Sequence, residues 1–324
     1  MAKPSVYVTR SLPVEVIDKL KERYEVEVNL EDRALTKEEL KGKIKGRDAI
    51  VVVGNVIDEE ICQIAESQCK IFACYSVGYN NVDVEAATKH GIYVSNTPEI
   101  VTGATADLAL TLLLSTARRV LECDKFVRSG QTSWGPMTLV GSQVSGKTIG
   151  IIGGGRIGMA VAQRAKGFDM NIIYTDVNPN PTFETTTGGK FVDKETLLKT
   201  ADFISIHIPL FPTTRHFIGK NELQMMKKTT ILINTARGPI VDEKALVEAL
   251  QQGIIAGAGL DVFEQEPKLE SGLVELPNVV ITPHIGTSTT EIRIEMGLLC
   301  AQNIFAALDG EKPPTCLNPT AKEN

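Results

Sequence analysis

Short apolar segments alternate with helical segments along almost the whole of this 324-residue chain, and this alternation limits the folds open to it. In the first hundred residues, β-rich runs lie at 5–9, 24–28, 49–53, 70–76 and 91–96, with helical patterns between them at about 13–23, 37–45, 58–67 and 83–90. A second alternation begins at residue 148, with strand-like runs at 148–152, 171–175, 202–206, 230–234, 256–260 and 278–282. Apolar strands separated by helices indicate parallel sheets covered on both faces. The pattern therefore predicts an α/β protein with two doubly wound parallel sheets.

Composition and charge argue against several classes of protein. Hydrophobic residues make up 43% of the chain, charged residues make up 23%, and the formal net charge is −6. No basic cluster stands out, so we do not expect nucleic acid as a partner. The N-terminal segment has no signal-peptide core, and the most apolar stretch, 104–117, contains Asp107 and is too short to span a bilayer. We therefore expect a cytoplasmic protein without a membrane partner.

Cysteine usage fits the same compartment. The six cysteines form no CxxC pair and no zinc-like spacing; they are Cys62, Cys69, Cys74, Cys123, Cys300 and Cys316. We expect small buried residues in a reducing environment and no metal site.

Two segments between the alternating blocks have distinct characters. The helix expected at about 105–117 is apolar on nearly every side, which predicts burial all round, either as a plain core helix or in an interface between domains or subunits. The segment 129–146 is rich in Gly and Ser and has no periodicity. Connections of this length are usually functional.

A glycine-rich turn follows the strand at 148–152. Gly153, Gly155 and Gly158 have G-x-G-x-x-G spacing after an apolar strand and at the start of a helix, which is the context of a dinucleotide site. The helix N-terminus offers N–H groups to phosphates. Asp176 ends the next strand, where a carboxylate can bind the ribose hydroxyls and repel the extra phosphate of NADP. We expect NAD as the cofactor, in preference to NADP.

Polar residues follow three later strands. Arg237 comes after the strand at 230–234, Asp261 and Glu266 after 256–260, and His284 after 278–282. Ligands bind outside the carboxyl ends of strands in open α/β sheets, so these side chains should meet at the cofactor edge. Arginine can bind a carboxylate, and a histidine with a carboxylate partner can protonate a carbonyl. Three of these residues could instead be structural. Arg237 could be a surface or cap residue, Glu266 a solvated loop acid and His284 a strand-end residue.

The other histidines suggest structural roles. His90 precedes a glycine at a helix end and is expected to cap that helix. His207 and His216 flank a loop near the cofactor edge and are expected to be structural.

Several motifs in this order resemble the D-isomer-specific 2-hydroxyacid dehydrogenase family. They are "GIIGGGRIG", "NTARGPIVDE", "GLDVFEQEP" and "TPHIG", preceded by "YSVGYNNVD" and "NTPEIVTGATADLAL", so the resemblance covers essentially the whole chain. Within the family, glyoxylate/hydroxypyruvate reductases and 2-ketogluconate reductases look most similar. The resemblance implies a Rossmann NAD-binding domain at 100–287 inserted in a flavodoxin-like substrate or lid domain formed by 1–99 and 288–324.

The resemblance also implies roles for individual residues. Arg237 would bind the substrate carboxylate and carbonyl, His284 would be the acid/base, and Glu266 would be its partner. Val77 and Gly78 would offer backbone N–H groups to the substrate carboxylate. The residues that would line the cofactor, with Gly153, Gly155 and Gly158, are Thr105, Arg156, Ile157, Asp176, Ala236, Asp261 and Gly286. Trp134, on a Gly/Ser-rich loop, could be a packing anchor, but the resemblance implies that it would reach into the substrate pocket of the partner in a homodimer.

The chain departs from the family pattern at two positions, and other functions remain open. Gly154 stands where Leu is common and Thr287 where Ser is common, and both changes leave cofactor binding in place. The main hypothesis is an NADH-dependent reductase of small 2-keto acids such as glyoxylate and hydroxypyruvate. The alternatives are a 2-ketogluconate reductase and, in another class, an NADH-sensing protein like the corepressors that share this fold.

Overall fold

The computed structural model describes residues 3–31 and 33–321, and it divides into two compact units. One unit comprises the chain up to Val101 together with the chain from Thr287 onward, and the other is Thr102–Gly286. The boundaries expected from the sequence lie within two residues of these. No helix of the described residues is long and apolar enough to cross a membrane.

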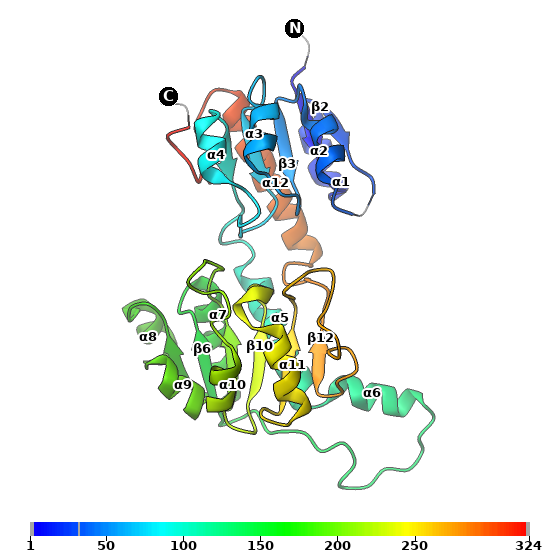
Figure 1. The fold of residues 1–324 in the computed structure, drawn as a ribbon, viewed down its shortest axis with the longest axis vertical. Helices are drawn as coiled ribbons and strands as arrows, with labels where there is room; N and C mark the ends of the chain where they lie inside the picture. The colour runs from blue at the N-terminus through cyan, green and yellow to red at the C-terminus, as the bar shows by residue number, and fades with distance from the viewer. Residues whose placement is uncertain (1–2, 32, 322–324) are drawn as a thin grey trace. The chain divides into compact units, whose positions relative to one another are not determined.

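The first unit is built on a five-stranded parallel sheet with the order β2-β1-β3-β4-β5, which is a flavodoxin-like order. The strands are β1 (Ser5–Val8), β2 (Glu25–Val28), β3 (Ala49–Val52), β4 (Ile71–Cys74) and β5 (Tyr93–Ser95). Helices α1 (Val14–Lys21) and α12 (Thr290–Leu308) pack on one face. Helices α2 (Lys37–Ile44), α3 (Glu59–Ala65) and α4 (Val84–Lys89) pack on the other (Figure 1). The C-terminal helix is therefore part of the sheet's cover.

The second unit has a seven-stranded parallel sheet with the order β12-β11-β10-β9-β6-β7-β8, a Rossmann order with one added strand. The strands are β6 (Thr148–Ile152), β7 (Asn171–Thr175), β8 (Lys190–Phe191), β9 (Phe203–Ile206), β10 (Ile231–Asn234), β11 (Gly257–Leu260) and β12 (Val279–Ile281). The helices are α5 (Thr102–Ala117), α6 (Val120–Arg128), α7 (Arg156–Ala165), α8 (Pro181–Thr187), α9 (Lys194–Thr200), α10 (Lys220–Met225) and α11 (Glu243–Gln251). The order of strands reverses between β6 and β9, and ligands bind at such a point.

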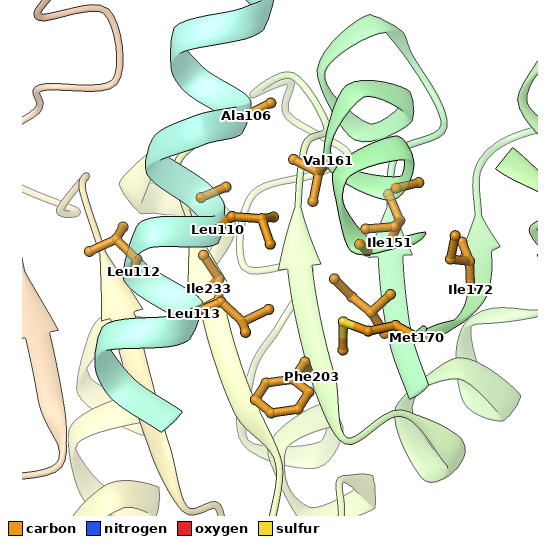
Figure 2. Packing of buried hydrophobic residues seen from close by; sticks show 14 of the residues in the cluster. Ala106, Leu110, Leu112, Leu113, Ile151, Val161, Met170, Ile172, Phe203 and Ile233 are labelled. Carbon is orange, nitrogen blue, oxygen red and sulfur yellow. The ribbon is translucent and has the colours of Figure 1, made fainter. Parts of the chain in front are cut away.

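Alternating side chains divide the core of this second unit between the two faces of its sheet. Ile151 and Ile233 join the cluster under α5 and α7, which also holds Leu110 and Leu113 (Figure 2). Leu232, the neighbour of Ile233, belongs instead to the cluster under α9, α10 and α11. Because both faces are covered, most residues of the longer strands are apolar, and the sequence pattern therefore predicts these strands.

Three local features differ from expectation. The edge strand β8 and the helix α6 were not anticipated, since β8 has two residues and none of the residues of α6 is buried. Helix α5 is buried on its sheet side, whereas Asp107 and Thr111 are exposed, so the single chain does not bury this helix all round. Asp107 instead accepts a hydrogen bond from Arg164 Nε (2.6 Å).

Candidate functional site

The glycine-rich turn after β6 has the geometry that a dinucleotide requires. Gly153 has φ +102°, and a Cβ there would lie 2.8 Å from the carbonyl of His207, which follows β9 across the switch point. A Cβ on Gly158 would lie 2.0 Å from the Gly153 carbonyl oxygen, so only glycine lets α7 approach the turn. Gly155 has nothing within 4 Å of a Cβ position, which leaves its backbone open to a pyrophosphate. Arg156 and Ile157 form the first turn of α7 beside it.

Asp176 is held in place at the end of β7. Its Oδ2 accepts a hydrogen bond from the N–H of Gly154 (2.8 Å) and its Oδ1 accepts one from Val177 (2.7 Å). The Gly154 carbonyl accepts a hydrogen bond from Asn180 Nδ2 (2.9 Å). A Cβ on Gly154 would lie 2.9 Å from the ring of buried Tyr174. The departure from Leu at position 154 therefore has a local reason, because Tyr174 fills the adjoining space.

Other features of the second unit suit a bound dinucleotide. The side chains of Thr105 and Asp261 lie within 3.7 Å of a Cβ position on Gly286, so these three cofactor candidates meet at one place. Thr235, between β10 and Ala236, has a buried hydroxyl with no hydrogen-bond partner among the described residues. A polar ligand would satisfy that hydroxyl. Sequence reasoning missed Thr235, although its place at a strand end beside Arg237 was a usable signal.

His284 and Glu266 form a hydrogen-bonded pair at the carboxyl edge of the sheet. His284 Nδ1 lies 2.8 Å from Glu266 Oε2, and Glu266 Oε1 accepts a hydrogen bond from the N–H of Phe263 (3.0 Å). Burial acts to raise the pKa of Glu266, but the hydrogen bond and charge of His284 outweigh it, and the pKa lies below its ordinary value. Glu266 is thus ionised beside the imidazole. His284 has φ +55° and its side chain is about half exposed (49%). Because Nδ1 is engaged by Glu266, Nε2 is the ring nitrogen left for a substrate.

The loop that carries His284 is fixed by Asp261. Asp261 is buried, and its Oδ1 accepts hydrogen bonds from Thr282 Oγ1 (2.6 Å) and the N–H of Ile285 (2.8 Å). Its Oδ2 accepts one from the N–H of Gly286 (2.8 Å). Burial raises the pKa of Asp261 despite these donors. The contacts make Asp261 a support for the His284 loop as well as a cofactor candidate.

Arg237 occupies the loop after β10. Asn234 at the end of β10 shapes this loop, since its Nδ2 donates to the Arg237 carbonyl (3.0 Å) and its Oδ1 accepts from the N–H of Ala236 (3.0 Å). Burial lowers the pKa of Arg237, and the negative charge of Glu266 opposes this. The structure therefore brings Arg237, Glu266 and His284 to one edge of the sheet in the second unit. Asn234 was not anticipated as a site residue.

Val77 and Gly78 lie in the first unit, after β4. Asn96 Nδ2 donates to the Val77 carbonyl (2.8 Å), and the Ser76 hydroxyl donates to the Gly78 carbonyl (2.7 Å). The N–H groups of Val77 and Gly78 make no hydrogen bond within residues 3–31 and 33–321. A short loop with its carbonyls engaged and its N–H groups available suits an anion. Ser76 and Asn96 were missed from the sequence because their partners depend on the loop conformation.

Trp134 lies on the long loop that follows α6 and extends away from the sheet (Figure 1). Its side chain is 64% exposed, so within this chain it anchors no core. The structure of one chain does not bring Trp134 into the cluster of Arg237, Glu266 and His284.

The remaining histidines and the cysteines have local partners or burial. His90 is the C-cap residue of α4 and pairs with Glu59 and Glu66. His207 hydrogen-bonds Ser205 (2.8 Å), and burial of its ring lowers its pKa to about 3. His216 pairs with Glu264 (2.8 Å). All six cysteines are free thiols, and in the described part of the chain no three His, Cys, Asp or Glu side chains are grouped to hold a metal ion.

Comparison with known proteins gives a consistent result over the full length. The family model of the D-isomer specific 2-hydroxyacid dehydrogenase NAD binding domain matches residues 110–286. A glyoxylate reductase of Thermococcus litoralis is 49% identical over 322 residues, covering 98% of this chain and 97% of that protein. The solved TT0316 protein of Thermus thermophilus has a TM-score of 0.90 and 44% identity, covering 97% of this chain and 99% of that one. A solved glyoxylate reductase of Paecilomyes thermophila has a TM-score of 0.86 and 35% identity, covering 98% of this chain and 99% of that one.

Proposed function

Because the chain belongs to the D-isomer-specific 2-hydroxyacid dehydrogenase family, we propose that it is an NADH-dependent reductase of small 2-keto acids, with glyoxylate and hydroxypyruvate as substrates and D-2-hydroxy acids as products. The observation that carries the proposal is the hydrogen bond between His284 and ionised Glu266 at the sheet edge that also holds the dinucleotide turn. The name shared by the curated relatives supports glyoxylate as a substrate.

Each residue of the site has one chemical task. Arg237 binds the substrate carboxylate through its guanidinium. In the first unit, Val77 and Gly78 offer backbone N–H groups that suit an anion. NADH, when bound, supplies a hydride to the keto carbon. His284 donates the proton of Nε2 to the keto oxygen, because its Nδ1 is engaged by Glu266. The negative charge of Glu266 favours the protonated form of His284 that this step needs.

A homodimer accounts for the exposed arm of the second unit, which we define as α6 and the loop 129–146. The exposed large apolar side chains of this arm are Val120, Leu121, Val127, Trp134, Met137 and Val140. Contiguous exposed apolar residues mark interaction surfaces. A second copy of the chain covers this arm, and Trp134 enters the substrate pocket of the partner, as the family resemblance implies.

We also propose a cytoplasmic location, which the cysteines support. All six are free thiols, and four of them are buried. Free thiols in this number are typical of a reducing compartment.

The direct test measures NADH oxidation by the purified protein with glyoxylate, hydroxypyruvate, pyruvate and 2-ketogluconate in parallel. Turnover of glyoxylate or hydroxypyruvate supports the proposal, whereas turnover of 2-ketogluconate alone supports a sugar-acid reductase. NADH binding without turnover of any of the four supports a sensor and overturns the proposal.

Replacing His284 tests its role as the acid. His284→Ala should lower kcat by about 10²–10⁴-fold, the usual contribution of a positioned general acid, while NADH still binds. His90→Ala is the matched control, because His90 also pairs with glutamates but lies in the first unit. Turnover close to that of the wild type in His284→Ala would show that His284 is a structural residue.

A further inference from the structure

We propose that Glu243, acting with Glu264, is a positioning residue that holds Glu266 against His284. The proposal rests on the proposed function, because it takes the Glu266–His284 pair as the reacting acid and its partner. Glu243 touches neither residue of the pair, and the family resemblance assigned it no role. Its effect reaches the site through the backbone of the segment 264–270, which contains Glu266.

The carboxylate of Glu243 holds both ends of the segment 264–270. Glu243 is buried (5% exposed), and its Oε2 accepts a hydrogen bond from the N–H of Glu264 (2.5 Å). Its Oε1 accepts one from the N–H of Glu270 (2.8 Å). In return, Glu264 Oε2 accepts a hydrogen bond from the N–H of Glu243 (3.4 Å). Glu266 thus lies in a loop whose two ends are hydrogen-bonded to one side chain.

Capping of helix α11 does not explain a buried carboxylate at position 243. Asp242 is the N-cap residue, and its Oδ1 accepts a hydrogen bond from the N–H of Ala245 (2.9 Å). The side chain of Glu243 is directed instead to the segment 264–270. Burying a carboxylate is unfavourable unless hydrogen bonds compensate it, so the two N–H donors are needed to keep Glu243 there. The arrangement is specific to holding that segment.

Glu264 extends the same connection to a third loop. Its Oε1 accepts hydrogen bonds from Arg215 Nη2 (2.7 Å) and His216 Nε2 (2.8 Å) on the loop after β9. That loop also bonds to the segment after Arg237, through the N–H of His216 to the Pro239 carbonyl (2.8 Å). The loops after β9, β10 and β11 are therefore joined at Glu264 and Glu243. Both Arg237 and Glu266 are carried by these joined loops.

Releasing the segment should weaken the Glu266–His284 hydrogen bond. Glu266 Oε1 accepts a hydrogen bond from the N–H of Phe263, the residue before Glu264, so the backbone next to the Glu243–Glu264 contact places this carboxylate. Glu266 and Asp261 are the negative charges that interact with His284, and Arg237 is the positive charge that interacts with Glu266. Asp261 and Arg237 lie outside the segment 264–270, so losing the Glu243 contacts should displace the carboxylate of Glu266 from His284 more than it displaces these two groups. The protonated form of His284 is then less favoured.

The test compares Glu243→Gln and Glu243→Ala with the wild type over a range of pH. A Gln side chain keeps one acceptor oxygen and an Ala side chain keeps none, so Gln should retain more activity than Ala. Because a misplacement near 1 Å can lower turnover about 10²-fold, we expect kcat of Glu243→Ala to fall about 10–100-fold. The pH above which reduction is lost should also move toward acid, while KM for NADH stays nearly constant. Glu248→Ala, on the same helix, is the matched control.

The double variant Glu243→Ala/Glu266→Gln decides whether Glu243 acts through Glu266. If it does, adding Glu243→Ala to Glu266→Gln moves the pH profile no further and lowers kcat by much less than in the wild type. Additive losses, or a Glu243→Ala enzyme with a lower Tm and the pH profile of the wild type, would overturn the proposal. Failure of the proposed function is recognised separately, because Glu266→Gln by itself would then leave the pH profile unchanged. Glu243→Gln serves for every comparison if Glu243→Ala does not fold.

Discussion

Replacing Gly238 by alanine tests how closely the loops that carry Arg237 and Glu266 must approach one another. A Cβ on Gly238 would lie 1.9 Å from both the carbonyl carbon and the carbonyl oxygen of Phe263. It would also lie 2.5 Å from the backbone nitrogen of Glu264. These are backbone atoms, so no change of rotamer relieves the clash. Gly238 begins a 3₁₀ turn, a conformation that alanine adopts readily, so the effect would come from this contact.

The required displacement follows from these distances. Real Cβ contacts below 3.0 Å essentially never occur, so the two loops must separate by at least about 1.1 Å. A misplacement of this size can lower turnover about 10²-fold. Overpacking of a buried contact also lowers the free energy of unfolding by about 1–3 kcal/mol. We therefore expect Gly238→Ala to fold, with a lower Tm and a kcat reduced about 100-fold.

The assay is steady-state NADH oxidation with glyoxylate, with Tm measured on the same samples. Gly167→Ala is the matched control, because Gly167 lies in the same unit and a Cβ there would meet nothing within 4 Å. It should leave kcat unchanged. A Gly238→Ala enzyme with the kcat of the wild type would refute the reasoning, since the loops would then tolerate separation without loss of turnover.

Three further predictions concern the cofactor, the arm and the first unit. Asp176→Ala should raise the ratio of kcat/KM with NADPH to that with NADH, because a repulsion of the 2′-phosphate is lost; equal use of both cofactors by the wild type would contradict this. Trp134→Ala should change the ranking of glyoxylate and hydroxypyruvate more than the Kd for NADH, and an active monomer in analytical ultracentrifugation would argue against a role across the dimer. The hydrogen bond with Glu59, together with that with Glu66, raises the pKa of His90 above 6.5. The contribution of His90 to the free energy of unfolding is therefore complete below pH 6.5 and is lost as pH rises through the raised pKa. Urea unfolding should show this dependence from about pH 6.5 upward in the wild type and not in His90→Gln.

Much of the fold could be predicted from the sequence because the strands are short, apolar and covered on both faces. The run at 148–152 is β6, and the run at 230–234 contains β10. The strand β8 could not be found in this way, because Lys190–Phe191 is too short to form a pattern. Helix α6 was missed for another reason, since none of its residues packs into the core of the chain.

The meeting of Arg237, Glu266 and His284 at one edge was predictable because β10, β11 and β12 are consecutive both along the chain and in the sheet. The contacts that hold the loops of these residues in place could not be predicted from the sequence. Glu243 and Glu264 are 21 positions apart, and their contacts depend on the conformation of two loops. No periodicity or motif marks such contacts, because each joins one side chain to a backbone N–H group.

The structure also distinguishes between Asp261 and Glu266, two carboxylates after β11, as partners of His284. Asp261 lies nearer to β11, but both of its oxygens accept hydrogen bonds from the loop of residues 282–286, and burial raises its pKa. Glu266 has one oxygen on its own backbone and the other on His284 Nδ1, and its pKa is lowered. Neighbouring acids whose pKa values are moved in opposite directions have different tasks. Glu266 is therefore the hydrogen-bond partner of the His284 ring, whereas Asp261 holds the backbone on which His284 stands.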